Sequence, residues 1–243
     1  MKDYGPETYG DRIADVYDGL YSGLDTDGAV ETLAELAGAG PVLELAIGTG
    51  RLALPLAERG LEVHGIDASE QMVAKLREKP GGDRIPVTMG DFADVAVEGR
   101  FSLVFVAFNT LFALPTQEDQ LRCFENVAAR LTDDGVFVVE VFFPDLARFD
   151  RGQRMQTTFV EADRVMLDAS RHDPIAQRVD SAHVVITEAG TKLYPVNVRY
   201  AFPPELDLMA RLAGLELVER WADWDRSPFT AESAKHVSVW RKP

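Results

Sequence analysis

Two glycines and three acids in the first hundred residues lie in or directly after short apolar runs. Gly48 and Gly50 follow the run "VLELAI", which itself carries Glu44, while Asp67 ends "HGID" and Asp91 ends "VTMGD". Glycine adopts the backbone conformations of tight turns and lets a ligand approach the main chain closely. Carboxylates beside such a turn accept hydrogen bonds from ribose hydroxyls or from an amine. The pattern therefore indicates a nucleotide-type ligand.

The glycine turn alone does not choose among such ligands. The residues from Gly48 to Ala53 satisfy the dinucleotide pattern G-x-G-x-x-A, which keeps an NAD(P)-dependent oxidoreductase open. A triphosphate loop is excluded, because the lysine and hydroxyl that must follow its second glycine are absent. Asp67 would serve NAD and adenosyl ligands equally well. Asp91 is more informative, because it offers an acceptor for an exocyclic amine beside the aromatic face of Phe92.

In the first 150 residues strand patterns alternate with helix patterns, and these elements must position the glycines and acids. Such alternation is typical of an α/β protein with a doubly wound parallel sheet, in which ligands bind beyond the carboxyl ends of the strands. The expected strands are Val42–Ala46, Leu61–Ile66, Ile85–Met89, Leu103–Phe108 and Val136–Phe142. The expected helices are Arg12–Tyr21, Gly28–Ala37, Leu52–Arg59, Ser69–Glu78 and Gln117–Leu131, with Ser69 and Thr116 as N-caps. Asp133-Asp134-Gly135 predicts a turn before the fifth strand.

The pattern changes after residue 143. Short alternating runs, separated by turn signals at Asp173-Pro174 and Ala189-Gly190, predict an antiparallel β insertion. After the insertion we expect a helix over Pro204–Ala213 and two strands, Leu215–Trp221 and Lys235–Trp240. These two strands predict a reversed C-terminal hairpin in a seven-stranded, Rossmann-like sheet. The expected organisation is the N-terminal helices and first part of the ligand-binding domain at 1–149, an inserted lid or dimerisation subdomain at 150–200, and the end of the core domain at 201–243.

Four segments together resemble the class I S-adenosylmethionine-dependent methyltransferases: "ELAIGTGR", "GIDASEQM", "MGDFADV" and "FSLVFVAFNTLFAL". The resemblance covers about residues 40–143 and implies S-adenosylmethionine as cofactor, with S-adenosylhomocysteine as product. It implies that Asp67 holds the ribose, that Asp91 and Phe92 contact adenine, and that Glu44 orders the loop near the methionyl ammonium. Ala46 stands where many members carry another glycine. The cofactor-binding residues that it implies are Tyr17, Glu44, Ala46, Gly48, Gly50, Arg51, Asp67, Ala68, Met72, Asp91, Phe92 and Ala107.

The N-terminal segment "TYGDRIADVYDGLY" resembles the opening of small-molecule methyltransferases, including the N-methyltransferases of deoxyamino sugars in antibiotic pathways. By that resemblance Tyr17 approaches the methionyl carboxylate, which Arg51 could also bind, and Tyr9 approaches the acceptor. Asn109 and Thr110, in the loop after the fourth strand, are expected to meet the methyl group or the acceptor. We therefore expect Tyr9 and Asn109 as catalytic residues. These relatives place a histidine in that loop where this chain has Ala113, which leaves no general base assigned.

Composition and net charge exclude several classes of binding partner. Forty acidic and 25 basic residues give a net charge of −15, which opposes nucleic-acid binding. An apolar leader and an eighteen-residue apolar run are both missing, so a cytoplasmic protein without membrane contact is expected. The single cysteine, Cys123, excludes an intrachain disulfide and a thiolate metal cluster, and no metal site is expected.

The expected function is methyl transfer to nitrogen or oxygen of a small molecule, such as a natural-product intermediate. The expected partners are that acceptor and, through the insertion, a second copy of the chain. The alternatives are an NAD(P)-dependent oxidoreductase and a non-catalytic, methyltransferase-like binding subunit.

Overall fold

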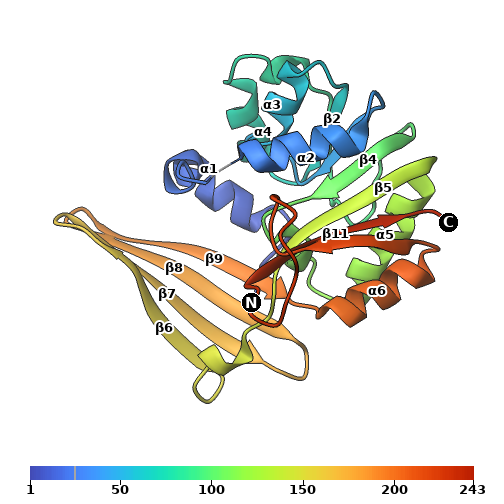
Figure 1. Ribbon diagram of the computed structural model, residues 1–243. Coiled ribbons are helices and arrows are strands. Elements are labelled where there is room, and N and C mark those ends of the chain that lie inside the picture. The colour runs from blue at the N-terminus through green and yellow to red at the C-terminus, as the bar shows by residue number, and fades with distance from the viewer. Residues whose placement is uncertain (25) are drawn as a thin grey trace.

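Short apolar runs form the centre of a seven-stranded sheet in the computed structural model, which describes residues 1–24 and 26–243 (Figure 1). Across the sheet the strands are β10 (Glu216–Trp221), β11 (Lys235–Arg241), β5 (Leu131–Phe142), β4 (Phe101–Val106), β1 (Val42–Leu45), β2 (Val63–Asp67) and β3 (Val87–Met89). From β5 to β3 all neighbours are parallel, whereas β11 runs antiparallel to both β5 and β10. The predicted α/β sheet with its reversed C-terminal hairpin is confirmed.

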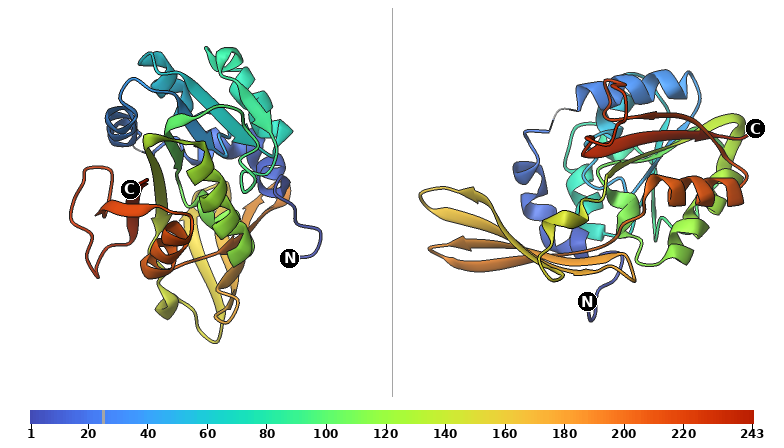
Figure 2. Two further views of the ribbon diagram at one scale, coloured as in Figure 1. Left: turned by 90° about the vertical axis from the view of Figure 1, so that its right-hand side faces the viewer. Right: turned by 60° about the horizontal axis from the view of Figure 1, so that its bottom comes forward.

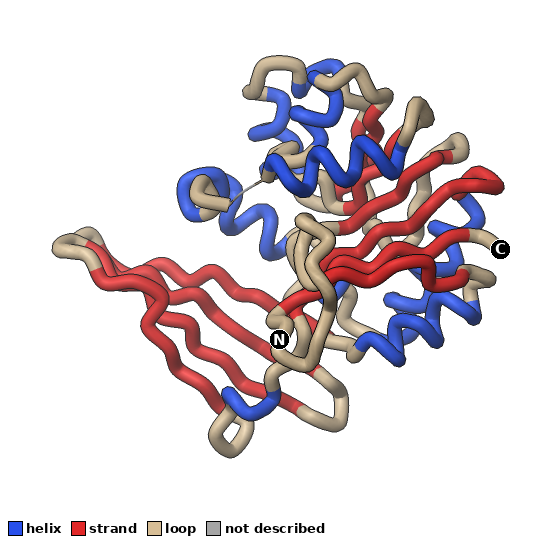
Figure 3. Tube along the Cα trace, in the orientation of Figure 1, coloured by secondary structure: helices blue, strands red, loops and turns tan. Residues whose placement is uncertain are grey.

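Helices cover both faces of this sheet (Figure 3). Alternate residues of β4 show the two faces, because Val104 and Val106 pack in the core with α5 and α6, while Leu103 and Phe105 pack with α2 and α3. The helices are α1 (Thr8–Leu20), α2 (Asp27–Ala37), α3 (Ala53–Glu58), α4 (Glu70–Arg77), α5 (Gln117–Arg130) and α6 (Pro203–Leu212). Within the described residues, none of them has the length and apolar character that crossing a membrane requires.

Two of these helices have the N-cap side chains that the sequence predicts. Ser69 Oγ accepts a hydrogen bond from the backbone N–H of Met72 at 3.1 Å, and Thr116 Oγ1 accepts one from the N–H of Asp119 at 3.0 Å. Each bond satisfies a donor that the first helical turn leaves unpaired. Both N-cap predictions are confirmed.

The start of β5 differs from the prediction. The strand begins at Leu131, which pairs with Phe101, and the register then shifts so that Leu103 pairs with Val136. The expected turn over residues 133–135 is therefore an irregularity inside the strand. Leu131 is fully buried, and its packing extends the strand across polar residues that read locally as a turn.

A second, four-stranded antiparallel sheet follows β5 in the chain and lies beside the first sheet (Figures 1 and 2). Asp173 Oδ1 accepts from the N–H groups of Ile175 and Ala176 in the β7–β8 turn, and Gly190 has a positive φ of 132° after the β8–β9 turn. Both turns lie where the sequence predicts them, and the antiparallel β insertion is confirmed. Its strands are β6 (Gln153–Val160), β7 (Arg164–Asp173), β8 (Arg178–Thr187) and β9 (Gly190–Arg199).

Arg199 fastens the end of β9 to the core. Its Nη1 donates to Gln120 Oε1 of α5 at 2.7 Å, and its Nη2 donates to Glu205 Oε1 of α6 at 2.6 Å. Gln120 Nε2 returns a bond to the carbonyl oxygen of Arg199 at 2.7 Å. Burial raises the pKa of Glu205, but hydrogen bonds from Arg199 and two glutamine side chains outweigh burial and lower the pKa overall. The inserted sheet is thus joined to helices α5 and α6 of the core through a largely buried polar network.

We expect Arg199→Met to lower the free energy of unfolding by about 3 kcal/mol, because the carboxylate of Glu205 loses its charged partner and Gln120 Oε1 loses its donor. Urea denaturation measures this. Arg164→Met removes an exposed ion pair with Glu161 and should cost less than about 1 kcal/mol. Equal losses in the two variants would contradict the role of the network.

Candidate active site

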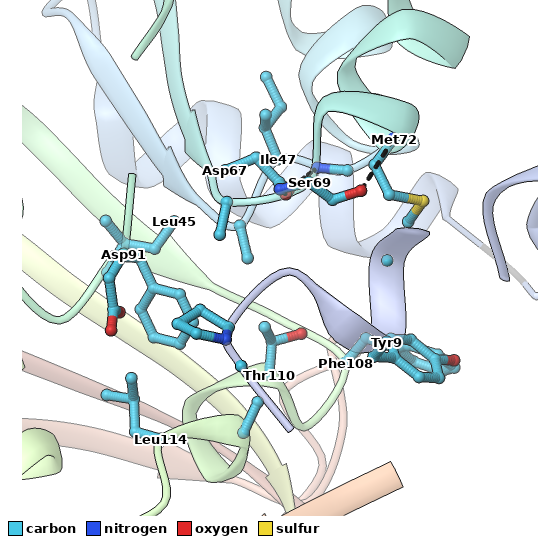
Figure 4. Close-up of a pocket in the computed structure, with 18 of the residues that line it drawn as sticks. Tyr9, Leu45, Ile47, Asp67, Ser69, Met72, Asp91, Phe108, Thr110 and Leu114 are labelled. Atoms are coloured by element: carbon cyan, nitrogen blue, oxygen red, sulfur yellow. Dashed lines mark hydrogen bonds between the residues drawn. The ribbon is translucent and has the colours of Figure 1, made fainter. Parts of the chain in front are cut away.

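One cavity of about 350 Å³ lies beyond the carboxyl ends of β1, β2, β3 and β4. Its opposite wall comes from the N-terminal segment and from β8 and β9, through Tyr4, Tyr9, Arg178 and Asn197. Figure 4 shows the labelled side chains around this space, with Asp67, Ser69 and Met72 on one side and Thr110 and Leu114 on the other. The cavity therefore joins strand ends of the large sheet to the inserted sheet.

Most of the predicted cofactor residues line this cavity. The predicted residues that line it are Tyr9, Tyr17, Glu44, Ala46, Gly48, Arg51, Asp67, Ala68, Met72, Asp91, Phe92 and Ala107. Gly50 and Asn109 are not among the lining residues. Acids that are far apart in the sequence thus meet at one site, because parallel strands end at the same edge of the sheet.

The glycine turn has a left-handed backbone over three of its positions. The φ angles are 56° at Ala46, 58° at Gly48 and 80° at Gly50. A Cβ on Gly48 would lie 3.3 Å from Met72 Cε, and one on Gly50 would lie 2.4 Å from Leu76 Cδ1. Gly48 thus keeps the main chain open toward the cavity. Gly50 instead lets α4 pack against the turn, which explains why it does not line the cavity.

Asp67 connects this turn to helix α4. Its Oδ2 accepts from the N–H of Gly48 at 2.7 Å, and its Oδ1 accepts from the N–H of Ser69 at 2.8 Å. Burial raises the pKa of Asp67, and these backbone donors oppose the rise. Each carboxylate oxygen carries a second lone pair, so Asp67 can still accept a ribose hydroxyl from the cavity.

Glu44 supplies a buried acceptor with no partner. Its Oε2 makes no hydrogen bond within the described chain, and the residue is only 6 % exposed. Burial raises the pKa of Glu44 to about 8, although the Arg51 guanidinium lowers it. A buried polar atom without a partner is costly unless a ligand satisfies it. An ammonium group of a ligand at this end of the cavity fits that requirement.

Arg51 and the N-terminal tyrosines lie together beside Glu44. The Arg51 guanidinium lies 5.2 Å from the centre of the Phe108 ring and bonds the hydroxyl of Tyr17. Burial raises the pKa of Tyr17 to about 12, with Arg51 opposing the rise. The hydroxyls of Tyr9 and Tyr21 are 3.1 Å apart, and burial raises the pKa of Tyr9 as well. With raised pKa values, the phenols of Tyr9 and Tyr17 stay protonated near neutral pH, so they serve as hydrogen-bonding groups and not as bases.

Asn109 differs from its predicted role. Its backbone is left-handed, with φ 67°, and its Oδ1 accepts from the N–H of Phe142 at 2.6 Å. The backbone N–H of Asn109 donates to the carbonyl oxygen of Glu140 at 3.0 Å. The side chain therefore ties the loop after β4 to the end of β5 and is used for structure. Phe108 and Thr110, its two neighbours in the chain, line the cavity in its place.

On the opposite wall the sequence predicted Tyr9 but not Arg178 or Asn197. Arg178 and Asn197 lie on β8 and β9, and Tyr4 Oη accepts from the N–H of Asn197 at 3.3 Å. Tyr4 lies just before the tyrosine-containing segment that the sequence analysis singled out. Neither Arg178 nor Asn197 belongs to a motif, and only the pairing of β8 with β9 and the position of the inserted sheet bring them to the cavity.

Comparisons with known proteins agree with this geometry. Residues 42–135 match a family model described as a methyltransferase domain. The chain is similar to the solved structure of the CcbJ methyltransferase from Streptomyces caelestis, with 47 % identity, 98 % of this chain and 99 % of that chain covered, and a TM-score of 0.92. It is 28 % identical to the cypemycin N-terminal methyltransferase of a Streptomyces species over 96 % of this chain and 97 % of that protein. It is also 32 % identical to a dTDP-3-amino-3,6-dideoxy-alpha-D-glucopyranose N,N-dimethyltransferase of Streptomyces fradiae over 58 % of each chain.

The raised pKa of Glu44 predicts a pH-dependent stability. The folded state favours the neutral carboxyl of Glu44. Its contribution to the free energy of unfolding is therefore fully present below the ordinary pKa of 4.5 and is lost as the pH rises through about 8. Glu44→Gln cannot ionise. The variant should therefore gain stability relative to the wild type as pH rises, by up to about 1.4 kcal/mol per pH unit within that window.

Urea unfolding of both proteins from pH 5 to pH 9 measures this difference. Glu98→Gln, which changes an exposed carboxyl, is the matched control and should follow the wild type. Parallel pH curves for the wild type and Glu44→Gln would contradict the raised pKa.

Proposed function

Because the chain belongs to the S-adenosylmethionine-dependent methyltransferases, we propose that it methylates a nitrogen atom of a small molecule. The observation that supports this proposal is the cavity that joins the cofactor-side strand ends to the wall formed by the N-terminal segment and the inserted sheet. Its volume of about 350 Å³ lies in the range of small-molecule sites. Family membership gives no support to the oxidoreductase alternative.

The residues on the strand side fit the cofactor. Asp67 would accept the ribose hydroxyls, Asp91 with Phe92 would contact adenine, and Glu44 would meet the methionyl ammonium. Arg51 and Tyr17 would bind the methionyl carboxylate, since both offer donors on the same side of the cavity. When bound, the cofactor supplies a methyl group activated by its sulfonium.

The acceptor side favours nitrogen over oxygen. The loop after β4 lines the cavity with Ala113 where the resemblance expects a histidine, and the described lining residues include no histidine at all. Asp119 also lines the cavity, but its Oδ2 accepts from Thr116 Oγ1 at 2.6 Å and its Oδ1 pairs with Arg122 at 2.7 Å. An amine needs only to arrive unprotonated, whereas a hydroxyl needs a base. The names of two relatives, an N-terminal methyltransferase and an N,N-dimethyltransferase, support the same choice.

The chain's own contribution is to orient the acceptor and exclude water. Tyr9, whose hydroxyl is held by Tyr21, would position the acceptor through a hydrogen bond. The contact between Tyr4 and the edge of β9 closes the N-terminal segment onto the inserted sheet, which we take as the lid of the cavity. Holding two reactants in line in a dry cavity supplies much of the rate without a strong base. A cytoplasmic location and a homodimer stay predictions.

Cofactor affinity tests the strand side. Calorimetry should detect binding of S-adenosylhomocysteine and no comparable binding of NAD. Asp67→Asn should weaken the binding of S-adenosylhomocysteine by about 1.5–3 kcal/mol, because a charged acceptor is lost and the turn at Gly48 loses the carboxylate that holds it. Asp94→Asn, at an exposed carboxylate three residues after Asp91, is the control. Unchanged affinity in folded Asp67→Asn would remove Asp67 from the site.

Turnover tests the acceptor side. With S-adenosylmethionine, amino sugars should gain a methyl group on nitrogen, whereas the matched sugars with a hydroxyl in place of the amine should not react. The rate should rise with pH until the acceptor amine is deprotonated, and mass spectrometry measures the product. Methylation of hydroxyls alone would overturn the choice of nitrogen. Cofactor binding without turnover of any acceptor would support the non-catalytic subunit.

A further inference from the structure

Arg178 is a cation at the cavity that the cofactor does not account for. Two arginines line the cavity within the described chain, Arg51 and Arg178. Arg51 lies beside Tyr17 and Phe108, close to the glycine turn. Arg178 instead begins β8 and pairs across to Arg199, on the wall that the inserted sheet contributes. This wall faces the acceptor in the proposed function, on which the inference below rests.

The guanidinium of Arg178 is poorly satisfied by the protein. Its Nε is buried and has no hydrogen-bond partner in the described chain. Its Nη2 reaches Asp180 Oδ1 only at 3.5 Å. That same oxygen already accepts from Asn197 Nδ2 and lies 3.6 Å from the amino group of Met1. Asp173, which pairs with Arg178 across β7 and β8, is a second acid near the guanidinium. Because a guanidinium carries five N–H donors and the side chain is 37 % exposed, donors of its Nη groups are left for a ligand.

The chemistry of these donors indicates what they bind. The planar fork of a guanidinium matches the two oxygens of a carboxylate or a phosphate. The other charged residues around the cavity are mostly acids, namely Glu44, Asp67, Asp91 and Asp119. Against these acids and the net charge of −15, the arginine side chains that line the cavity are the groups that attract an anion, and Arg51 lies beside Glu44 whereas Arg178 does not. An anionic group on the acceptor would therefore be directed to Arg178.

We propose that Arg178 determines acceptor specificity by binding an oxyanion, so that the acceptor carries both the reacting amine and a carboxylate or phosphate. Asn197 and Tyr4 flank this site and complete its polar wall. Arg178 thereby selects the acceptor and orients its amine toward the strand side of the cavity.

Binding of matched probes tests the proposal. Protein saturated with S-adenosylhomocysteine is titrated with glucosamine 6-phosphate against glucosamine, and with 4-aminobutanoate against 4-aminobutanamide, so that the two pairs separate phosphate from carboxylate. At least one anionic probe should bind tenfold or more tightly than its neutral partner. Arg178→Gln should abolish this preference and Arg178→Lys should keep only part of it, because lysine lacks the fork. Arg164→Gln, at an exposed arginine of the same inserted sheet, should keep it in full.

Asp180→Asn separates ligand binding from a purely structural role. Removal of the carboxylate that competes for Arg178 should tighten binding of the anionic probe about threefold. If Arg178 only supports Asp180 in the fold, Arg178→Gln and Asp180→Asn should both lower the melting temperature and leave probe preference unchanged, which would overturn the proposal. Equal binding of both members of each pair by the wild type, or no binding of either anion, would overturn it too. Failure of the wild type to bind S-adenosylhomocysteine would instead count against the proposed function.

Discussion

The carboxylate of Asp67 holds together the three elements on which the cavity depends. It ends β2, and its two oxygens accept from the N–H of Gly48 after β1 and from the N–H of Ser69 before α4. Ser69 in turn caps α4 and donates to Asp11 of α1 at 2.6 Å. A turn with a left-handed backbone is thereby fixed against a helix start and against the N-terminal helix. One charged side chain thus sets the shape of the cofactor side of the cavity.

The two sheets contribute different walls of the cavity. The parallel sheet brings its strand-end acids to one edge, which is the position that suits a nucleoside-type cofactor. The inserted sheet is held through Arg199, Gln120 and Glu205, and through the contact of Tyr4 with β9. Since these bonds cross between distant segments, the wall that the inserted sheet contributes to the cavity depends on the folding of both sheets.

Burial controls the charge of the groups around the cavity. It raises the pKa values of Glu44, Tyr9 and Tyr17, so a carboxyl and two phenols are largely neutral before a ligand arrives. An incoming ammonium would favour the charged form of Glu44. Arg51 lies beside Glu44 and opposes the rise of its pKa, whereas Arg178 lies on the wall that the inserted sheet contributes.

The sequence by itself determined the fold and most of the cofactor side. Apolar runs of strand length, the helices between them, and the N-caps Ser69 and Thr116 depend on local chemistry, and the ends of parallel strands must meet at one edge. Glu44, Asp67 and Asp91 could therefore be placed together without coordinates. Only the tertiary structure decided that Asn109 turns to β5, that Leu131 already belongs to a strand, and that Arg178 and Asn197 reach the cavity. These outcomes depend on a left-handed loop, a register shift and the docking of the second sheet, which are set by packing between residues far apart in the chain.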